Sequence, residues 1–279
     1  MPGSDDDPRH ARAALTALPS HTPVSDGPDR TDPVEVWARL APHHPGIDPA
    51  RLLDAASADG WRLLIPGDPG WPAVLEDAAG APVGLWVRGS GDLPTLTRRS
   101  VTVVGAVAGT DYGTQITRDL VWDLTTPLAA RPVTVAVGGL MGGIDATALW
   151  VAVAHRRAVA VLSSSRAVTR YTRNLFTDVA DGGTVVCLAP PGTSPTLGHH
   201  TARIRLLAAL TRATVLIESG LVGDAFKTAR TAHLYRRPVL VVPGPITSRL
   251  SAGPHALLRD GTARLITSAA EVFTVLDRS

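Results

Sequence analysis

The sequence predicts an α/β protein with a Rossmann-like, doubly wound and mostly parallel sheet, preceded by a short helical segment. From about residue 98 onwards, apolar and β-branched runs of six or seven residues recur, and most are followed by a helical stretch of about 10–15 residues. The runs are continuously apolar rather than alternating, as expected for strands buried on both faces of a parallel sheet. Repeated alternation of strand and helix is typical of this fold class.

The same pattern divides the chain into three predicted segments. Residues 1–33 are rich in Pro, Asp, Ser and Thr without apolar periodicity, which predicts a disordered tail. Residues 34–97 are predicted to form a small helical lead-in, with two short helices and then short strands at 62–65 and 83–89. Residues 98–279 form the predicted Rossmann-like domain, with strands at 100–105, 133–138, 158–163, 184–189, 213–218, 238–244 and 263–268.

Composition bounds the class and location of the protein. The 279 residues are 44% hydrophobic and 19% charged, so most of the chain can fold around a core. No apolar run approaches the roughly 18 residues that cross a bilayer, and the acidic N-terminus lacks the apolar region of a secretory signal. The only cysteine, Cys187, lies inside a predicted strand as a core residue, which excludes a disulfide framework and a cysteine-based zinc site. We expect a soluble, cytoplasmic protein without membrane contact.

Glycines dominate the turns after the first two predicted strands of the domain, where ligands of doubly wound folds bind. The turn after Gly105 is not the GxGxxG fingerprint, and no acidic residue follows the second strand to hold a ribose, so NAD binding is not expected. The second turn leads directly into a helix, which Asp145 is expected to cap. Four glycines there let the backbone approach an anion closely, namely Gly138, Gly139, Gly142 and Gly143.

Basic residues follow the later strands. His199 and His200 stand before a helix that carries Arg203 and Arg205. Because no carboxylate or cysteine lies at ligand spacing, the two histidines predict no metal site. Lys227, the only lysine of the chain, lies near the start of another helix, where a contact to a phosphate and a solvated surface position are both open.

Charge and motif content favour a binding protein over an enzyme. Residues 1–100 hold 14 acidic residues and nine arginines, whereas residues 101–279 hold 11 acidic and 18 basic residues. The positive part attracts phosphates but is too weakly charged to identify a nucleic-acid partner by itself. No GxSxG elbow, Walker A motif, HExxH or close carboxylate pair is present, so no catalytic residue and no cofactor is predicted.

Several motifs in order carry a resemblance to a known family. They read IPGDPGWPAVLEDAAGAPVGLWVRG at 65–89, VVGAVAGTDYG at 103–113, VGGLMGGIDATAL at 137–149, TARIRLLAALTRATVLIES at 201–219 and RRPVLVVPGPITSRLSAG from 236. Over roughly residues 61–278, the chain resembles the DNA-processing protein A (DprA/Smf) family.

The resemblance implies an extended Rossmann fold in a cytoplasmic protein that binds single-stranded DNA and forms a homodimer. It also implies that the protein helps to load the RecA recombinase onto DNA taken up in natural transformation, without an established turnover reaction. The residues that it places at the nucleic acid are Gly105, Gly138, Gly139, Gly142, Gly143, His200, Arg203, Arg205, Lys227 and Thr228.

Several positions depart from the family's motifs, among them the following three. The family's loop arginine is Val107 here, its asparagine between two arginines is Ile204, and a glycine close to the bound anion is Asp224. A carboxylate repels a phosphate, and Lys227 is expected to offset that repulsion without replacing the absent arginine. We expect a divergent paralogue with weakened or altered DNA binding and without a C-terminal winged-helix domain.

Two alternatives stay open at this point. The glycine turn at 138–143 suits a mononucleotide equally well, so the chain can be a nucleotide-binding sensor or a nucleotide hydrolase of the related Rossmann-like superfamily. Against hydrolysis, the PGGxGTxxE signature is absent. The protein can also act mainly through protein partners, with a degenerate groove.

Overall fold

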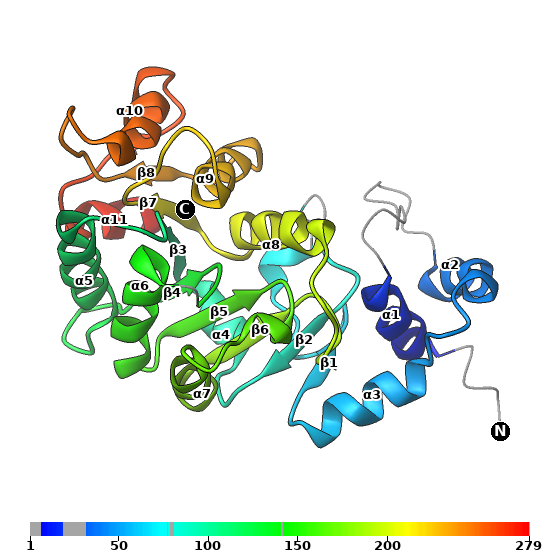
Figure 1. Ribbon diagram of the computed structural model, residues 1–279. Coiled ribbons are helices and arrows are strands. Elements are labelled where there is room, and N and C mark those ends of the chain that lie inside the picture. Colours follow the sequence, from blue (N-terminus) through cyan, green and yellow to red (C-terminus); the bar gives the residue numbers. More distant parts are fainter. Residues whose placement is uncertain (1–6, 19–31, 77, 79–80, 141, 279) are drawn as a thin grey trace.

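One nine-stranded sheet runs through the described part of the computed structural model, which comprises residues 7–18, 32–76, 78, 81–140 and 142–278. Its strand order is β1-β2-β6-β5-β4-β3-β7-β8-β9 (Figure 1). All neighbours from β6 to β9 pair in parallel, whereas β1–β2 and β2–β6 pair antiparallel. The strands are β1 (Arg62–Leu64), β2 (Leu85–Arg88), β3 (Ser100–Val104), β4 (Thr134–Val137), β5 (Ala158–Leu162), β6 (Thr184–Cys187), β7 (Ala213–Leu216), β8 (Val239–Val241) and β9 (Arg264–Leu265).

Helices cover both faces of this sheet, so the predicted doubly wound class is confirmed. One face carries α5 (Asp111–Thr125), α6 (Gly143–Ala154), α7 (Arg173–Gly182) and α11 (Ala269–Leu276). The other face carries α4 (Leu93–Arg98), α8 (Leu197–Leu210), α9 (Asp224–Leu234) and α10 (Ala252–Arg259). Short 3₁₀ turns interrupt the loops at η3 (Ala73–Leu75), η4 (Ser165–Ala167) and η5 (Arg249–Ser251). In the described ranges, no helix combines the length and apolar character needed to cross a membrane.

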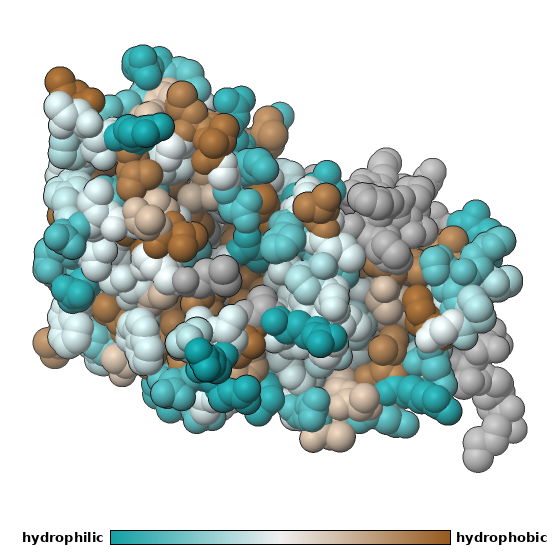
Figure 2. All heavy atoms as spheres, in the orientation of Figure 1, coloured by the Kyte–Doolittle hydropathy of each residue, from teal (hydrophilic) through white to brown (hydrophobic). Residues whose placement is uncertain are grey.

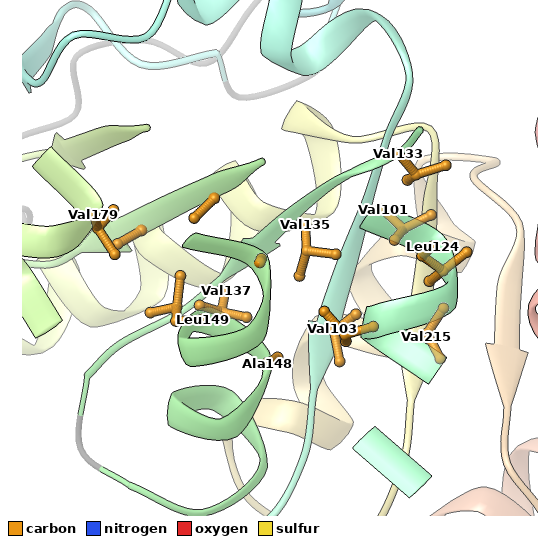
Figure 3. Packing of buried hydrophobic residues seen from close by; sticks show 14 of the residues in the cluster. Val101, Val103, Leu124, Val133, Val135, Val137, Ala148, Leu149, Val179 and Val215 are labelled. Carbon is orange, nitrogen blue, oxygen red and sulfur yellow. The ribbon is translucent and has the colours of Figure 1, made fainter. Parts of the chain in front are cut away.

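The strands from β3 to β8 are rich in apolar residues because both of their faces are buried. Val101 and Val103 of β3 pack with Leu124 and Leu149 from the α5 and α6 side (Figure 3). The next residue, Val104, belongs to the cluster on the α9 side. This alternation explains why the seven strands predicted between 100 and 268 all form, with ends trimmed by one or more residues.

The position of β3 in the sheet determines where a ligand-binding crevice is expected. The chain continues from β3 to its neighbour β4 on one side, and it later returns to β7 on the other side. The direction of strand order therefore reverses between β3 and β7. In open α/β sheets, this reversal leaves a crevice beyond the carboxyl ends of the two strands.

The prediction of a disordered tail over residues 1–33 is wrong for residues 8–17, which form α1 (Pro8–Ala17). Asp7 caps this helix by accepting a hydrogen bond from the backbone N–H of Arg9 at 2.8 Å. Its small apolar residues, among them Ala11 and Leu15, pack against α2 (Pro33–Leu40). Composition did not reveal this helix, because its apolar face consists mainly of alanine and the residues on either side of it are polar. Residues 1–6 and 19–31 lie outside the described residues.

The lead-in segment joins the main sheet. It contains α2, η2 (Ala41–His43) and α3 (Pro49–Ala58) as predicted helical structure, followed by β1 and β2. Because β2 pairs with β6, the boundary predicted at residue 98 divides one continuous sheet. The indole N–H of Trp86 on β2 donates a 2.9 Å hydrogen bond to the hydroxyl of Thr16 on α1, which ties the N-terminal helix to the sheet.

Candidate functional site

A cavity of about 500 Å³ lies at the reversal point between β3 and β7. The turns after β3, β4 and β7 form its walls together with the first turns of α8 and α9, and we call it the glycine pocket. Six of the residues predicted to contact nucleic acid line it, namely Gly105, Gly138, Gly139, Gly142, His200 and Arg203. The structure thus brings together turns that are up to about a hundred residues apart in the sequence.

Gly143 shapes the pocket without lining it. Its φ angle of 61° lies in the left-handed region, and a Cβ atom there would come within 2.1 Å of the carbonyl oxygen of Val107. The following N–H, of Ile144, donates to the carbonyl of Ala106 at 3.2 Å. Only glycine therefore lets the start of α6 lie directly against the turn that follows β3.

Asp145 has a different role from the predicted one. It does not cap its own helix, since α6 begins after Gly142 without any side-chain cap. Its carboxylate instead accepts a 3.1 Å hydrogen bond from the N–H of Gly105 and so joins the turns after β3 and β4. Burial raises the pKa of Asp145 to about 7, against the lowering effects of the Gly105 N–H and the Arg203 guanidinium. The nearby Asp224 carboxylate raises this pKa further.

Arg203 lies against the glycine turn. A Cβ atom added to Gly138 would lie 2.9 Å from its Nη1 atom, so the guanidinium lies directly beside the backbone there. Its Nη2 atom forms an ion pair with Asp224 at the start of α9. Its Nε atom is buried and has no hydrogen-bond partner among the described residues. Asp224 is thus paired with Arg203, and an offset of its charge by Lys227 stays a prediction.

Three predicted residues lie outside the glycine pocket. The Thr228 hydroxyl is buried and donates at 2.8 Å to the carbonyl of Asp224 within α9, so it is not available to a ligand. Arg205 and Lys227 are exposed on α8 and α9 and do not line the pocket. A contact from either of them to a longer ligand stays a prediction.

Glu218 is a structural residue of the site that the motif analysis missed. Its buried carboxylate accepts hydrogen bonds from the backbone N–H and the hydroxyl of Thr110, at 2.9 and 2.7 Å. Its carbonyl accepts from the N–H of Ala106 at 2.8 Å. Glu218 therefore holds the start of α5 against the end of β7. The sequence signal that could have identified Glu218 is an acidic residue at the end of a buried apolar run.

The mouth of the pocket has apolar side chains. Val107 and Val222 line the pocket and are 64% and 84% exposed. In the space-filling view, the surface around α9 and α10 shows apolar residues gathered beside polar ones (Figure 2). The exposed residues Leu221, which precedes α9, and Ile246, which precedes α10, belong to the loops of this region.

Comparisons of the sequence agree with this architecture. Residues 62–277 match the sequence profile of a family described as DNA recombination-mediator protein A. A putative DNA processing protein DprA from Mycobacterium tuberculosis is 35% identical over 287 aligned positions, which cover 93% of this chain and 70% of the relative. The DNA processing protein DprA from Streptococcus pneumoniae is 30% identical over 205 positions, covering 72% of this chain and 70% of the relative.

Solved structures of two DprA proteins share the fold. The X-ray structure of DprA from Streptococcus pneumoniae has a TM-score of 0.71 at 23% identity, over 96% of this chain and 93% of that one. A structure of DprA from Helicobacter pylori, described for its unique single-stranded DNA binding mode, has a TM-score of 0.66 at 23% identity, over 78% of this chain and 96% of that one. The chain therefore belongs to the DNA recombination-mediator protein A family, the DprA/Smf group of DNA-processing proteins.

Proposed function

We propose that this protein binds single-stranded DNA through the glycine pocket and helps to load the RecA recombinase onto that DNA. In this proposal it acts in the cytoplasm as a homodimer, during DNA uptake and recombination, by binding rather than by turnover. The observation that carries the proposal is the Arg203 guanidinium, which lies beside the glycine turn at the reversal point of the sheet.

Two helices begin at the pocket in a way that favours an anion. Both α6 and α9 start after a glycine, Gly142 and Gly223, and neither N-terminus has a side-chain cap. Uncapped N–H groups and the positive end of the helix dipole attract phosphate oxygens. The absence of side chains on these glycines lets a sugar–phosphate backbone approach closely.

The mouth of the pocket suits a nucleobase. The exposed His200 ring and the apolar Val107 and Val222 lie beside the place that a phosphate would occupy. Stacking of a base on an exposed ring contributes about 1–3 kcal/mol in single-strand binders. The Helicobacter pylori relative, which shares the fold, is described as binding this same class of ligand.

The carboxylates weaken this site. Arg203 is already paired with Asp224, and Asp145 adds a second acidic group to the pocket. We therefore propose a weaker affinity for single strands than an arginine in place of Val107 and a glycine in place of Asp224 would give.

The proposal is tested by fluorescence anisotropy with an oligothymidylate of about 20 nucleotides, longer than the site sizes of about 4–16 nucleotides typical of single-strand binders. We expect a preference over duplex of equal length and a log–log salt slope that falls by about 0.7 in Arg203→Gln. Arg157→Gln, which removes a charge outside the pocket, serves as the control. No binding of the oligonucleotide at low salt would refute the proposal, and binding of mononucleotides alone would favour the sensor alternative.

The RecA and homodimer parts need separate measurements. Light scattering should give twice the mass of one chain. The protein should also speed the formation of RecA filaments on single strands that are coated with single-strand binding protein. A monomer, or no change in the rate of filament formation, would refute the corresponding part.

A further inference from the structure

A second cavity, of about 450 Å³, lies at the amino ends of the strands, whereas the glycine pocket lies at their carboxyl ends. Its walls come from η3 and from the ends of α8 and α9. Arg212 stands directly before β7, and Arg237 precedes β8, so both mark the amino ends of their strands. We call this cavity the arginine pocket, after Arg212, Arg236 and Arg237, which line it together with Tyr235.

The two pockets lie at opposite ends of the same pair of packed helices. His200 and Asp224 lie in the first turns of α8 and α9 at the glycine pocket, with Arg203 one turn further along α8, whereas Arg212 and Tyr235 follow the last turns of these helices. With 14 residues, α8 is about 21 Å long. A single strand that leaves the glycine pocket can therefore reach the arginine pocket over a few nucleotides.

Within the described ranges, the three arginines of the arginine pocket form no ion pair. None of the ion pairs among the described residues includes Arg212, Arg236 or Arg237. The Nε atom of Arg212 donates a long 3.4 Å hydrogen bond to the carbonyl of Arg98. Burial and the nearby Arg212 lower the pKa of the half-buried Arg237 guanidinium. Two guanidinium groups brought together with partial loss of water cost free energy, unless an anion lies between them.

Helix termination explains only part of this cluster. Arg236 has a φ angle of 57°, and the N–H of Arg237 donates to the carbonyl of Ala232 at 2.9 Å, which closes α9. Positive side chains at this end also favour the helix dipole. The closing of α9 does not account for Arg212, which follows the end of a different helix, α8, and lines the same cavity.

The end of α6 provides an internal comparison. Arg156 has a φ angle of 56°, and the N–H of Arg157 donates to the carbonyl of Ala152 at 2.9 Å, so the backbone repeats the geometry of α9. There, however, the Arg156 guanidinium donates to the carbonyl of Asp181 at 3.2 Å. Neither Arg156 nor Arg157 lines the arginine pocket.

We propose that the arginine pocket binds a phosphate group, and that this is a phosphate of the same DNA strand that enters the glycine pocket. Arg212 and Arg237 contact the phosphate oxygens, and the half-buried Tyr235 ring lies beside the adjoining nucleotide. The assignment to a strand rests on the proposed function, whereas the binding of an anion does not.

The test uses the full chain with Arg212→Gln combined with Arg237→Gln, and Arg157→Gln as the matched control. We expect the double variant to lower the salt slope for the oligothymidylate of about 20 nucleotides by between about 0.7 and 1.4, and the control to leave it unchanged. Inorganic pyrophosphate should raise the melting temperature of the wild-type protein and of the control, and raise it less in the double variant, where only the glycine pocket remains to bind it. Without any anion, the double variant should melt at or above the wild-type temperature, because a repulsion has been removed.

Three outcomes would overturn the proposal. If the double variant responds to pyrophosphate as Arg157→Gln does, the pocket binds no phosphate. If the response to pyrophosphate is reduced while the salt slope is unchanged, the ligand is a free polyphosphate and not a strand. A lower melting temperature without any anion would assign the arginines a structural role. Arg203→Gln separates the two sites, because it should weaken the binding of the oligonucleotide and keep the part of the pyrophosphate response that the double variant loses.

Discussion

Asp224 at the start of α9 forms an ion pair with Arg203 on α8, across the mouth of the glycine pocket. Arg203 is largely buried, whereas half of the Asp224 side chain is exposed. A phosphate that binds Arg203 must therefore compete with an internal carboxylate. If the proposed function holds, a single substitution at this contact should change the affinity for DNA.

Replacement of Asp224 by Asn should strengthen the binding of single strands. The substitution frees Arg203 and removes a negative charge from the mouth of the pocket. An interaction of about 1 kcal/mol between unit charges in water corresponds to a gain of about fivefold in affinity. Anisotropy titrations at two salt concentrations measure this gain, which should be larger at low salt.

Asp178→Asn is the matched control for this substitution. Asp178 is exposed on α7 and forms none of the ion pairs found among the described residues. Its replacement changes the net charge equally and should leave the affinity nearly unchanged. Equal gains in the two variants would contradict a specific role of Asp224.

Binding of single strands should weaken as the pH rises through about 7. Burial raises the pKa of Asp145 to about 7, so this carboxyl is neutral below that value and repels a phosphate above it. Asp145→Asn should remove most of this dependence.

The Asp145 carboxyl should also make the stability of the protein depend on pH. Asp145 has an ordinary pKa of 3.8 and a folded-state pKa of about 7, so the folded state binds more protons between these values. The free energy of unfolding therefore falls as the pH rises from about 4 to 7. The free energy of unfolding, measured by urea titration at each pH, should fall over this window in the wild-type protein and fall less in Asp145→Asn. Parallel pH profiles would show that the carboxyl is not perturbed.

Substitution of Gly143 by Ala should destabilise the site strongly. The new Cβ atom would lie 2.1 Å from the carbonyl oxygen of Val107, at a φ angle of 61°. Strain and overlap together should cost about 3 kcal/mol in the free energy of unfolding, with loss of oligonucleotide binding. Gly46→Ala is the control, because Gly46 has open space around its Cβ position. A loss below about 0.5 kcal/mol at Gly143 would contradict the close approach of the two turns.

Replacement of Thr16 by Val should lower the free energy of unfolding by about 1–3 kcal/mol. The shape of the side chain is kept, but the fully buried indole N–H of Trp86 loses its acceptor. Thr201→Val changes the same atoms on the exposed face of α8 and should cost less than about 0.5 kcal/mol. Equal effects of the two substitutions would mean that α1 is not anchored to the sheet.

Short-range patterns predicted the strands from β3 to β8, because each is buried on both faces and forms an apolar run that can be recognised without a distant partner. They also predicted that Gly138 and Gly105 lie at one edge, since the carboxyl ends of parallel strands share an edge. They did not predict that Asp145 accepts from Gly105, 40 residues away, because that contact depends on how closely two turns approach.

The helix α1 was not predicted for the same reason, because its stability also depends on contacts with residues that are distant in the sequence. A ten-residue helix is marginal by itself, so its stability comes from packing and from contacts such as that between Thr16 and Trp86, 70 residues apart. Local composition carries no record of such a partner. The pairing of Arg203 with Asp224 was missed for a similar reason, since Lys227 is nearer in sequence.

Arg9 of α1 donates a 2.6 Å hydrogen bond to the carbonyl of Leu63 on β1, an edge strand of the sheet, and also pairs with Asp68. One backbone acceptor on the outer side of β1 is thereby already occupied. A terminal strand with vacant acceptors is a template onto which a second molecule can add its own strand. Loss of α1 would thus do more than remove a helix, because it would also leave a backbone acceptor of an edge strand open to pairing with a second molecule.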